Sequence, residues 1–117
     1  MGLYHSEVYM PKLLQQPCFE GRLRYSRHAI DEANSDRYGV ITPPPYFYVE
    51  GKEKLIEVET DSKTGKVVKQ VWRQALDDER DIVLVITADG NVKTLWVNLK
   101  TDKHKTLDRS RYIKPRP

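Results

Sequence analysis

The sequence predicts an α+β domain in which one N-terminal helix precedes a four-stranded antiparallel β-meander. Three observations predict it: a capped helical pattern, a later run of alternating strands, and turn signals between those strands. A chain of 117 residues has room for one core. We therefore expect an irregular segment over residues 1–20, one domain over 21–112 and a basic tail over 113–117.

The helix is predicted from Arg27 to Arg37, after a short strand at residues 22–25. Ser26 is the expected N-cap, because its hydroxyl can accept a hydrogen bond from a first-turn amide. Gly39 is expected to end the helix in a left-handed conformation. The side of the helix that should face a sheet carries Ala29, Ile30 and Ala33.

Four strands are predicted after the stiff triple-proline loop. They cover Lys54 to Thr60, Val67 to Leu76, Ile82 to Ile86 and Val92 to Leu99. The third is continuously apolar, as expected of a central strand covered on both faces. Gly65 marks one hairpin loop, and Asp89-Gly90 predicts a two-residue turn.

Composition excludes several classes of function. One cysteine, Cys18, rules out an internal disulfide framework, and the histidines lack the spacing of zinc ligands. There is no Gly-rich phosphate loop, nucleophile elbow or HExxH motif. We expect no metal, no cofactor and no membrane association, and the cytoplasm is the expected location.

Positive charge is concentrated at the C-terminus. Residues 100–117 carry seven Lys/Arg and two Asp, whereas residues 1–99 carry thirteen Lys/Arg and fifteen Asp/Glu. Such asymmetry indicates an anionic partner, and nucleic acid is the first candidate. A solvated tail without a specific partner is the alternative. Arg109 and Arg111 of this region are candidate contacts to RNA.

His104 begins that basic region and is a candidate for phosphodiester chemistry. An imidazole can move protons in either direction near neutral pH. Lys103 and Lys105 flank it and can hold phosphate, and Thr106 can donate a hydrogen bond to a phosphate oxygen. A solvent-exposed histidine with no chemical role is the alternative.

His28, in the first predicted helical turn, is a second candidate. A helix N-terminus favours anions, so a phosphate can dock there with help from Arg24 and Arg27. The alternative is a surface histidine that pairs with Glu32 one turn later.

One face of the last predicted strand supplies further candidates. Alternation places Thr94, Trp96 and Asn98 on that face. Trp96 can stack a base and Asn98 can orient one, and Arg73 on a neighbouring strand can share the face. The alternative is an ordinary sheet face in which Trp96 is packed under the N-terminal segment.

Two stretches resemble small bacterial and phage domains of unknown function: R-Y-S-R-H-A-I-D-E-A at residues 24–33, and the strands and tail at 81–112. Their layout is similar to that of RelE-like and colicin-like ribonuclease toxins, over about half of the chain. The resemblance implies metal-independent RNA cleavage, and the matching positions are His28, Thr94, Asn98, His104 and Thr106. Glu32 departs from the pattern, in which a basic residue often follows the helix histidine by one turn.

We therefore expect a domain that binds RNA rather than DNA, and we leave open whether it also cuts it. In the cleaving form a ribose 2′-hydroxyl attacks the adjacent phosphate. His104 or His28 is base or acid, and Lys103, Lys105 and Arg73 stabilise the developing charge.

The alternatives are a non-catalytic nucleic-acid-binding module, and an adaptor or inhibitor that binds a protein partner or antitoxin. An exposed aromatic patch built from Tyr46, Phe47 and Tyr48 would favour a protein partner.

Overall fold

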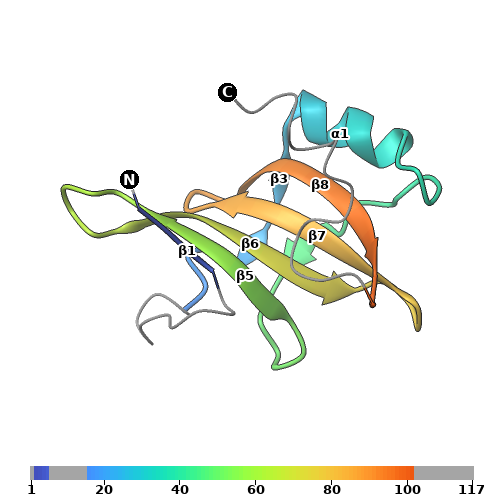
Figure 1. The fold of residues 1–117 in the computed structure, drawn as a ribbon. Helices are drawn as coiled ribbons and strands as arrows, with labels where there is room; N and C mark the ends of the chain where they lie inside the picture. Colours follow the sequence, from blue (N-terminus) through green and yellow to red (C-terminus); the bar gives the residue numbers. More distant parts are fainter. Residues whose placement is uncertain (1, 6–15, 102–117) are drawn as a thin grey trace.

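Six strands form one twisted sheet in the computed structural model, which describes residues 2–5 and 16–101 (Figure 1). The strand order is β1-β5-β6-β7-β8-β3. The strands are β1 (Gly2–His5), β3 (Arg24–Tyr25), β5 (Lys54–Thr60), β6 (Val67–Ala75), β7 (Arg80–Thr87) and β8 (Asn91–Leu99). All neighbours are antiparallel except β3, which runs parallel to β8. A second, two-stranded sheet pairs β2 (Gly21–Arg22) with β4 (Tyr46–Phe47).

The predicted fold class is wrong, because the domain is mainly β and its main sheet is mixed. The four predicted strands are present as β5 to β8, but β1 extends one edge of their sheet and β3 the other. β1 lies within the segment predicted to be irregular and pairs Gly2 with Thr60. β3 pairs through only two residues. Such short edge strands are held by backbone hydrogen bonds to distant partners, and they leave no alternating pattern in the sequence.

The hairpin loops follow the predicted turn chemistry with one change. Gly65 has a φ of +74° in the β5–β6 loop, as expected. The β7–β8 loop has three residues, 88–90, instead of the predicted two-residue turn. Both loop types use a glycine with positive φ, so Asp-Gly alone does not distinguish them. Gly90 has a φ of +88°, and a Cβ there would lie 2.6 Å from the Phe19 ring. Both the backbone conformation and the lack of space therefore require glycine.

Helix α1 (Arg27–Asn34) begins as predicted and ends early. The Ser26 hydroxyl accepts a hydrogen bond from the Ala29 amide at 3.0 Å and donates one to the Lys93 carbonyl of β8 at 3.0 Å. The helix ends at Asn34, three residues before the predicted end at Arg37, and Ser35 is its C-cap. Its hydroxyl bonds to the Asp31 carbonyl at 2.8 Å, which ends the helix locally. Gly39 does have a positive φ, +106°, but it lies beyond the helix end.

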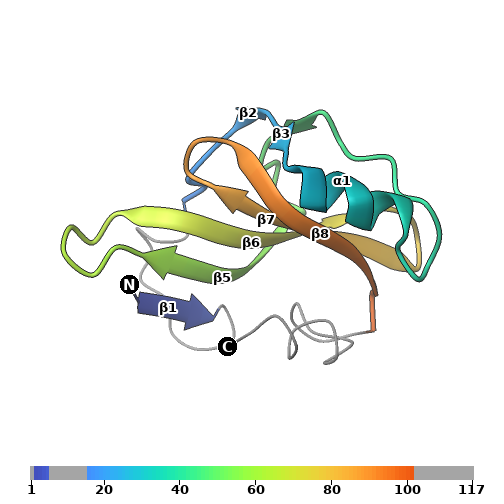
Figure 2. The same ribbon diagram turned by 90° about the horizontal axis from the view of Figure 1, so that it is seen from above.

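The helix lies along β8 at the side of the sheet rather than across its middle (Figures 1 and 2). Only a narrow, small-residue face is therefore covered: Ala29 and Ala33 are fully buried. The prediction that Ile30 faces the sheet is wrong, since it is 42% exposed.

Side chains of α1 and of the turn that follows it complete the edge of β8 beyond its short pairing with β3. Glu32 Oε1 accepts the Leu95 amide at 3.2 Å, and the Thr94 hydroxyl donates to the same oxygen. Asp36 Oδ1 accepts the Val97 amide at 3.2 Å. Carboxylates thus stand where a neighbouring strand would supply carbonyls, and they block this edge against another chain.

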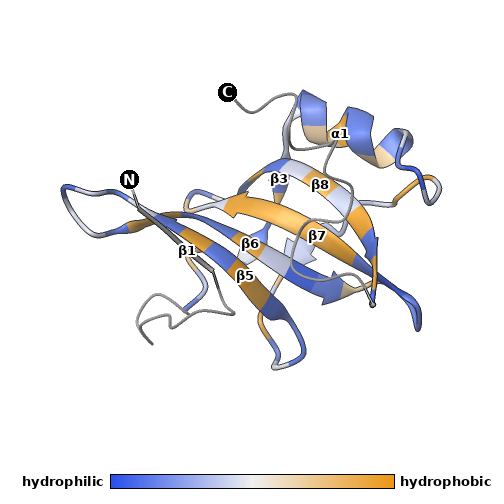
Figure 3. Ribbon diagram, viewed as in Figure 1, coloured by the Kyte–Doolittle hydropathy of each residue, from blue (hydrophilic) through white to orange (hydrophobic). Residues whose placement is uncertain are grey.

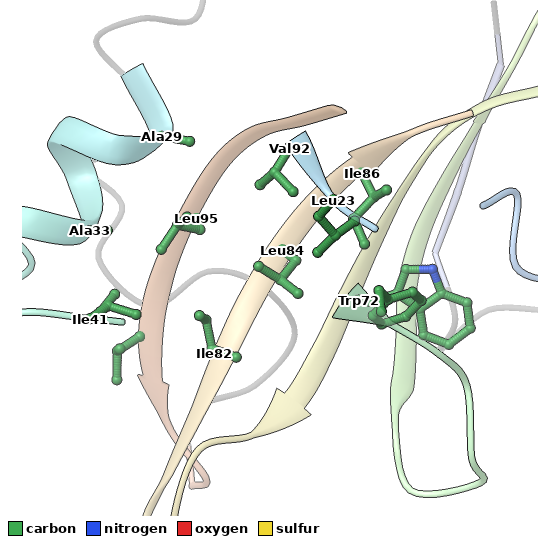
Figure 4. Packing of buried hydrophobic residues seen from close by; sticks show 12 residues of the cluster. Leu23, Ala29, Ala33, Ile41, Trp72, Ile82, Leu84, Ile86, Val92 and Leu95 are labelled. Atoms are coloured by element: carbon green, nitrogen blue, oxygen red, sulfur yellow. The ribbon is translucent and has the colours of Figure 1, made fainter. Parts of the chain in front are cut away.

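Two apolar clusters lie on opposite faces of the sheet. The larger joins sheet residues such as Trp72, Leu84 and Leu95 to α1 and to the segments around β2 and β4 (Figure 4). The smaller contains Ile56, Val71, Val83, Val85 and Trp96. β7 contributes to both and is apolar from Ile82 to Ile86 (Figure 3), and its place between β6 and β8 confirms it as a central strand. Among the described residues, no helix is long and apolar enough to cross a membrane.

Asp36→Ala should lower the free energy of unfolding by about 1–3 kcal/mol, because it leaves the buried Val97 amide without its acceptor. Asp31→Ala is the matched control, since it removes only an exposed pair with Arg27 and should cost at most about 0.5 kcal/mol. Urea unfolding followed by circular dichroism measures both. Equal effects of the two changes would contradict the role of Asp36 at the β8 edge.

Candidate nucleic-acid interface

The predicted site around His104 lies outside the residues that the structure describes. The residues concerned are Lys103, His104, Lys105, Thr106, Arg109 and Arg111. Charge counts remain informative: the described residues carry thirteen Lys/Arg and fourteen Asp/Glu, and the rest of the chain carries seven and three. The residues outside the described part therefore supply the whole positive excess. Because the described part has no net positive charge, an anion site on it must depend on basic residues that lie close together.

Four exposed basic residues lie on the segments that join at the junction of β3, α1 and β8, which we call the basic corner: Arg24, Arg27, His28 and Lys93. Parallel pairing places Arg24 beside Asn91 of β8. The Ser26 amide then donates to the Val92 carbonyl at 3.1 Å, and its hydroxyl bonds to the Lys93 carbonyl. The start of α1 is thereby fixed beside Lys93, and no acidic residue stands in the first helical turn. An anion is favoured at such a position.

Carboxylates partly offset this charge. Arg27 Nε lies 3.6 Å from Asp31, and Arg24 donates to Asn91 Oδ1 at 3.1 Å and to the Asp89 carbonyl at 2.9 Å. A hydrogen bond from the Thr87 hydroxyl, aided by the charge of Arg24, lowers the pKa of Asp89, so it stays ionised. With Glu32 beside His28, three carboxylates stand against the three permanently positive side chains of the corner, so attraction of a phosphate depends on their arrangement and not on a net charge.

His28 pairs with Glu32 one turn later, as expected of a surface histidine in the alternative to a phosphate site. Its Nε2 lies 3.3 Å from Glu32 Oε2, and its side chain is 70% exposed. Glu32 is mostly buried and is also held by Thr94 and the Leu95 amide. Thr94, a predicted RNA contact, is thus engaged in positioning Glu32.

Arg73 lies on the other face of the sheet from α1. It follows Trp72, which belongs to the apolar cluster on the face that α1 covers, so alternation turns Arg73 to the opposite face. Its Nη2 lies 2.9 Å from Asp81 Oδ2 and donates to the Leu99 carbonyl at 3.0 Å, while Lys100 Nζ binds the other Asp81 oxygen at 2.6 Å. The structure does not bring Arg73 to His28, so they cannot act on one phosphate.

Trp96 and Asn98 are also buried on that second face. Trp96 is 3% exposed and packs with Val71, Val83 and Val85, so its ring has no free face for a base. Asn98 is fully buried beside Asp81 in register. The predicted row on β8 is therefore an interior row.

An exposed aromatic pair lies at β4. Tyr46 and Tyr48 are 48% and 51% exposed, whereas Phe47 between them is buried against Trp72, with ring centroids 5.4 Å apart. The two tyrosine rings are 6.5 Å apart and inclined by 20°. The predicted three-residue patch is thus a two-residue one, as strand alternation requires.

Arg22 joins this pair, and sequence reasoning missed it. Its guanidinium carbon lies 5.7 Å from the Tyr46 ring centroid, and Nη1 donates to the Tyr46 hydroxyl at 3.3 Å. Only the pairing of Arg22 with Tyr46 across β2 and β4 reveals the contact, and two-residue strands carry no usable pattern.

The described residues contain no group of three or more His, Cys, Asp or Glu able to hold a metal ion. Cys18 is half-buried; its amide donates to Gln70 Oε1 at 2.7 Å. Burial raises the pKa of the Cys18 thiol to about 11.

Arg73→Met should lower the free energy of unfolding by about 3–5 kcal/mol, because it leaves the buried Asp81 without its main partner. The double change Arg73→Met/Asp81→Asn should cost less than the sum of the single changes. Lys69→Met is the control. Lys69 lies on β6 like Arg73 and makes a 2.9 Å pair with Glu59 of β5, but its side chain is 38% exposed. It should cost at most about 1 kcal/mol. Additive effects in the double variant would contradict a structural ion pair.

Cys18 should react with iodoacetamide at pH 8 about 100-fold more slowly than an unhindered cysteine, because a pKa near 11 instead of 9.0 leaves far less thiolate. Mass spectrometry of timed samples measures the rate, and the urea-unfolded chain is the control. The same shift makes stability fall as pH rises from 9.0 toward 11, since the unfolded chain loses the proton first. Rapid alkylation of the folded protein would show that the thiol is accessible.

Comparison with known protein families, curated proteins and solved structures finds no match to this chain. The resemblance to ribonuclease toxins stays a prediction.

Proposed function

We propose that this chain is a cytoplasmic RNA-binding domain that holds the phosphate backbone at the basic corner and through its basic C-terminal residues. The observation that carries the proposal is the junction of β3, α1 and β8, where the exposed residues Arg24, Arg27, His28 and Lys93 lie on adjoining segments. Backbone contacts by Lys and Arg supply most of the affinity in non-specific nucleic-acid binding.

A helix N-terminus adds to this attraction. Its orphan amides and dipole favour a phosphate, and Ser26 fixes the direction of the first turn. Since the described residues have nearly balanced charge, binding should depend on this local arrangement and on the basic segment, and it should weaken steeply with salt.

If the domain also cleaves RNA, His28 or His104 acts as the acid or base, and Arg73, which is held by Asp81, takes no part. Glu32 can orient the His28 ring as the carboxylate of an acid–base pair does. RNA cleavage in EDTA that is lost in folded His28→Ala or His104→Ala protein would add catalysis to the proposal. Salt-sensitive binding without cleavage leaves a binding module.

A second candidate function is that of an adaptor or inhibitor with a protein partner, such as an antitoxin. The exposed Tyr46–Tyr48 pair favours it, because exposed tyrosines are frequent anchors of protein interfaces.

Replacing Arg24, Arg27 and Lys93 together by alanine should weaken RNA binding at least about tenfold and flatten its salt dependence. Each lost phosphate contact reduces the slope of log K against log salt by about 0.7 for a single strand. Fluorescence anisotropy with a labelled oligoribonucleotide at several salt concentrations measures both quantities.

The charge-matched control replaces Lys52, Lys63 and Lys66, which are exposed in loops at or near the ends of β5. It should change the affinity and the slope much less. A control that weakens binding as strongly would refute the corner as the site, and a wild-type protein that binds no RNA would refute the function.

A further inference from the structure

We propose that Tyr46 and Tyr48 are a stacking platform for two bases of a single RNA strand, whose phosphates continue to the basic corner. This inference rests on the proposed RNA binding and adds to it the form of the ligand: unpaired, with its bases turned out. Below, the tyrosine platform means Tyr46 and Tyr48 together with Arg22.

The tyrosine platform is rigidly anchored. Phe47, between the two tyrosines, is fully buried against Trp72. The Pro45 carbonyl accepts the Leu23 amide at 2.9 Å, and the Val49 amide donates to Glu20 Oε2 at 2.8 Å. Both ends of the tyrosine segment are therefore held by hydrogen bonds to neighbouring segments, so ligand binding loses little free energy in ordering it.

The ring geometry suits unstacked bases. The two rings are nearly parallel and 6.5 Å apart, and each has about half of its residue surface exposed. The contact between the two rings places them on the same side of the chain, so both can face the same ligand. Unpaired bases stack on such rings without regard to sequence, whereas paired bases are already stacked on each other.

Positive charge runs from the tyrosine platform to the corner. Arg22 and Arg24 flank the buried Leu23 on one extended segment, so both lie on its outer side, about 7 Å apart. Figure 2 shows β2, β3 and the start of α1 following one another along one side of the molecule. Aromatic rings at one end and cationic groups along the rest form the usual combination for single-stranded nucleic acid.

A protein partner is the less favoured occupant of this surface. Arg22 lies over the Tyr46 ring, and the chain leads from it toward the four basic residues of the basic corner, which complements a polyanion better than a mixed protein surface.

The experiment measures binding of a labelled eight-nucleotide oligouridylate by fluorescence anisotropy. The test variant is Tyr46→Leu/Tyr48→Leu, and Tyr46→Phe/Tyr48→Phe keeps the rings. Val40→Ala/Leu76→Ala is the control, since both residues are exposed and apolar but lie outside the platform. Circular dichroism confirms that each variant is folded. The same oligonucleotide with abasic positions keeps its phosphates but cannot stack.

We expect the leucine variant to bind at least about tenfold more weakly, with an unchanged salt slope, and the phenylalanine and control variants to stay within about twofold of wild type. Abasic positions should weaken binding to wild type but not to the leucine variant. Equal binding by the leucine variant, or equal affinity for a duplex, would overturn the tyrosine platform and leave the proposed function standing. A wild-type protein that binds no RNA would overturn both, and the tyrosines would then belong to a protein interface.

Discussion

The outer edge of β8 is the constraint on which the rest of this structure depends. A nine-residue strand at the side of a sheet exposes amides that must find acceptors. This protein meets the requirement with three different groups in succession: the backbone of β3, Glu32 and Asp36. Because Glu32 belongs to α1 and Asp36 to the turn that follows it, the same hydrogen bonds fix the helix, and the fixed helix places the basic corner.

The division of the sheet into two faces follows from the same arrangement. α1 and the segments around β2 and β4 join the larger apolar cluster, while the other face gathers the smaller cluster and the Arg73–Asp81–Lys100 ion pairs. Arg73 thus helps to hold three strands together and is unavailable for chemistry on a phosphate. Exposed basic and aromatic groups near β2, β3 and β4 remain for binding, with the acidic Glu20 beside them.

Local signals explain what could be predicted from the sequence. Ser26 as a cap, the glycine at 65 and the apolar run of β7 each depend on residues close in the chain, and all three are found. The edge strands and the Arg22–Tyr46 contact depend on partners far apart in sequence, and short strands carry no periodic pattern. Trp96 shows a different limit: alternation identified its face correctly, but alternation does not say whether that face is buried.

The parallel pairing of β3 with β8 also has a consequence for how the corner comes into being. Arg24 meets Asn91 at a sequence separation of 67 residues, whereas β5 to β8 join through successive hairpins. Closing so long a loop is entropically costly, so local hairpins are expected to form before it. We therefore expect the cationic groups of α1 and β8 to come together after those hairpins have formed. A ligand that binds there recognises the complete native state and no partly formed one, and it shifts the folding equilibrium toward that state.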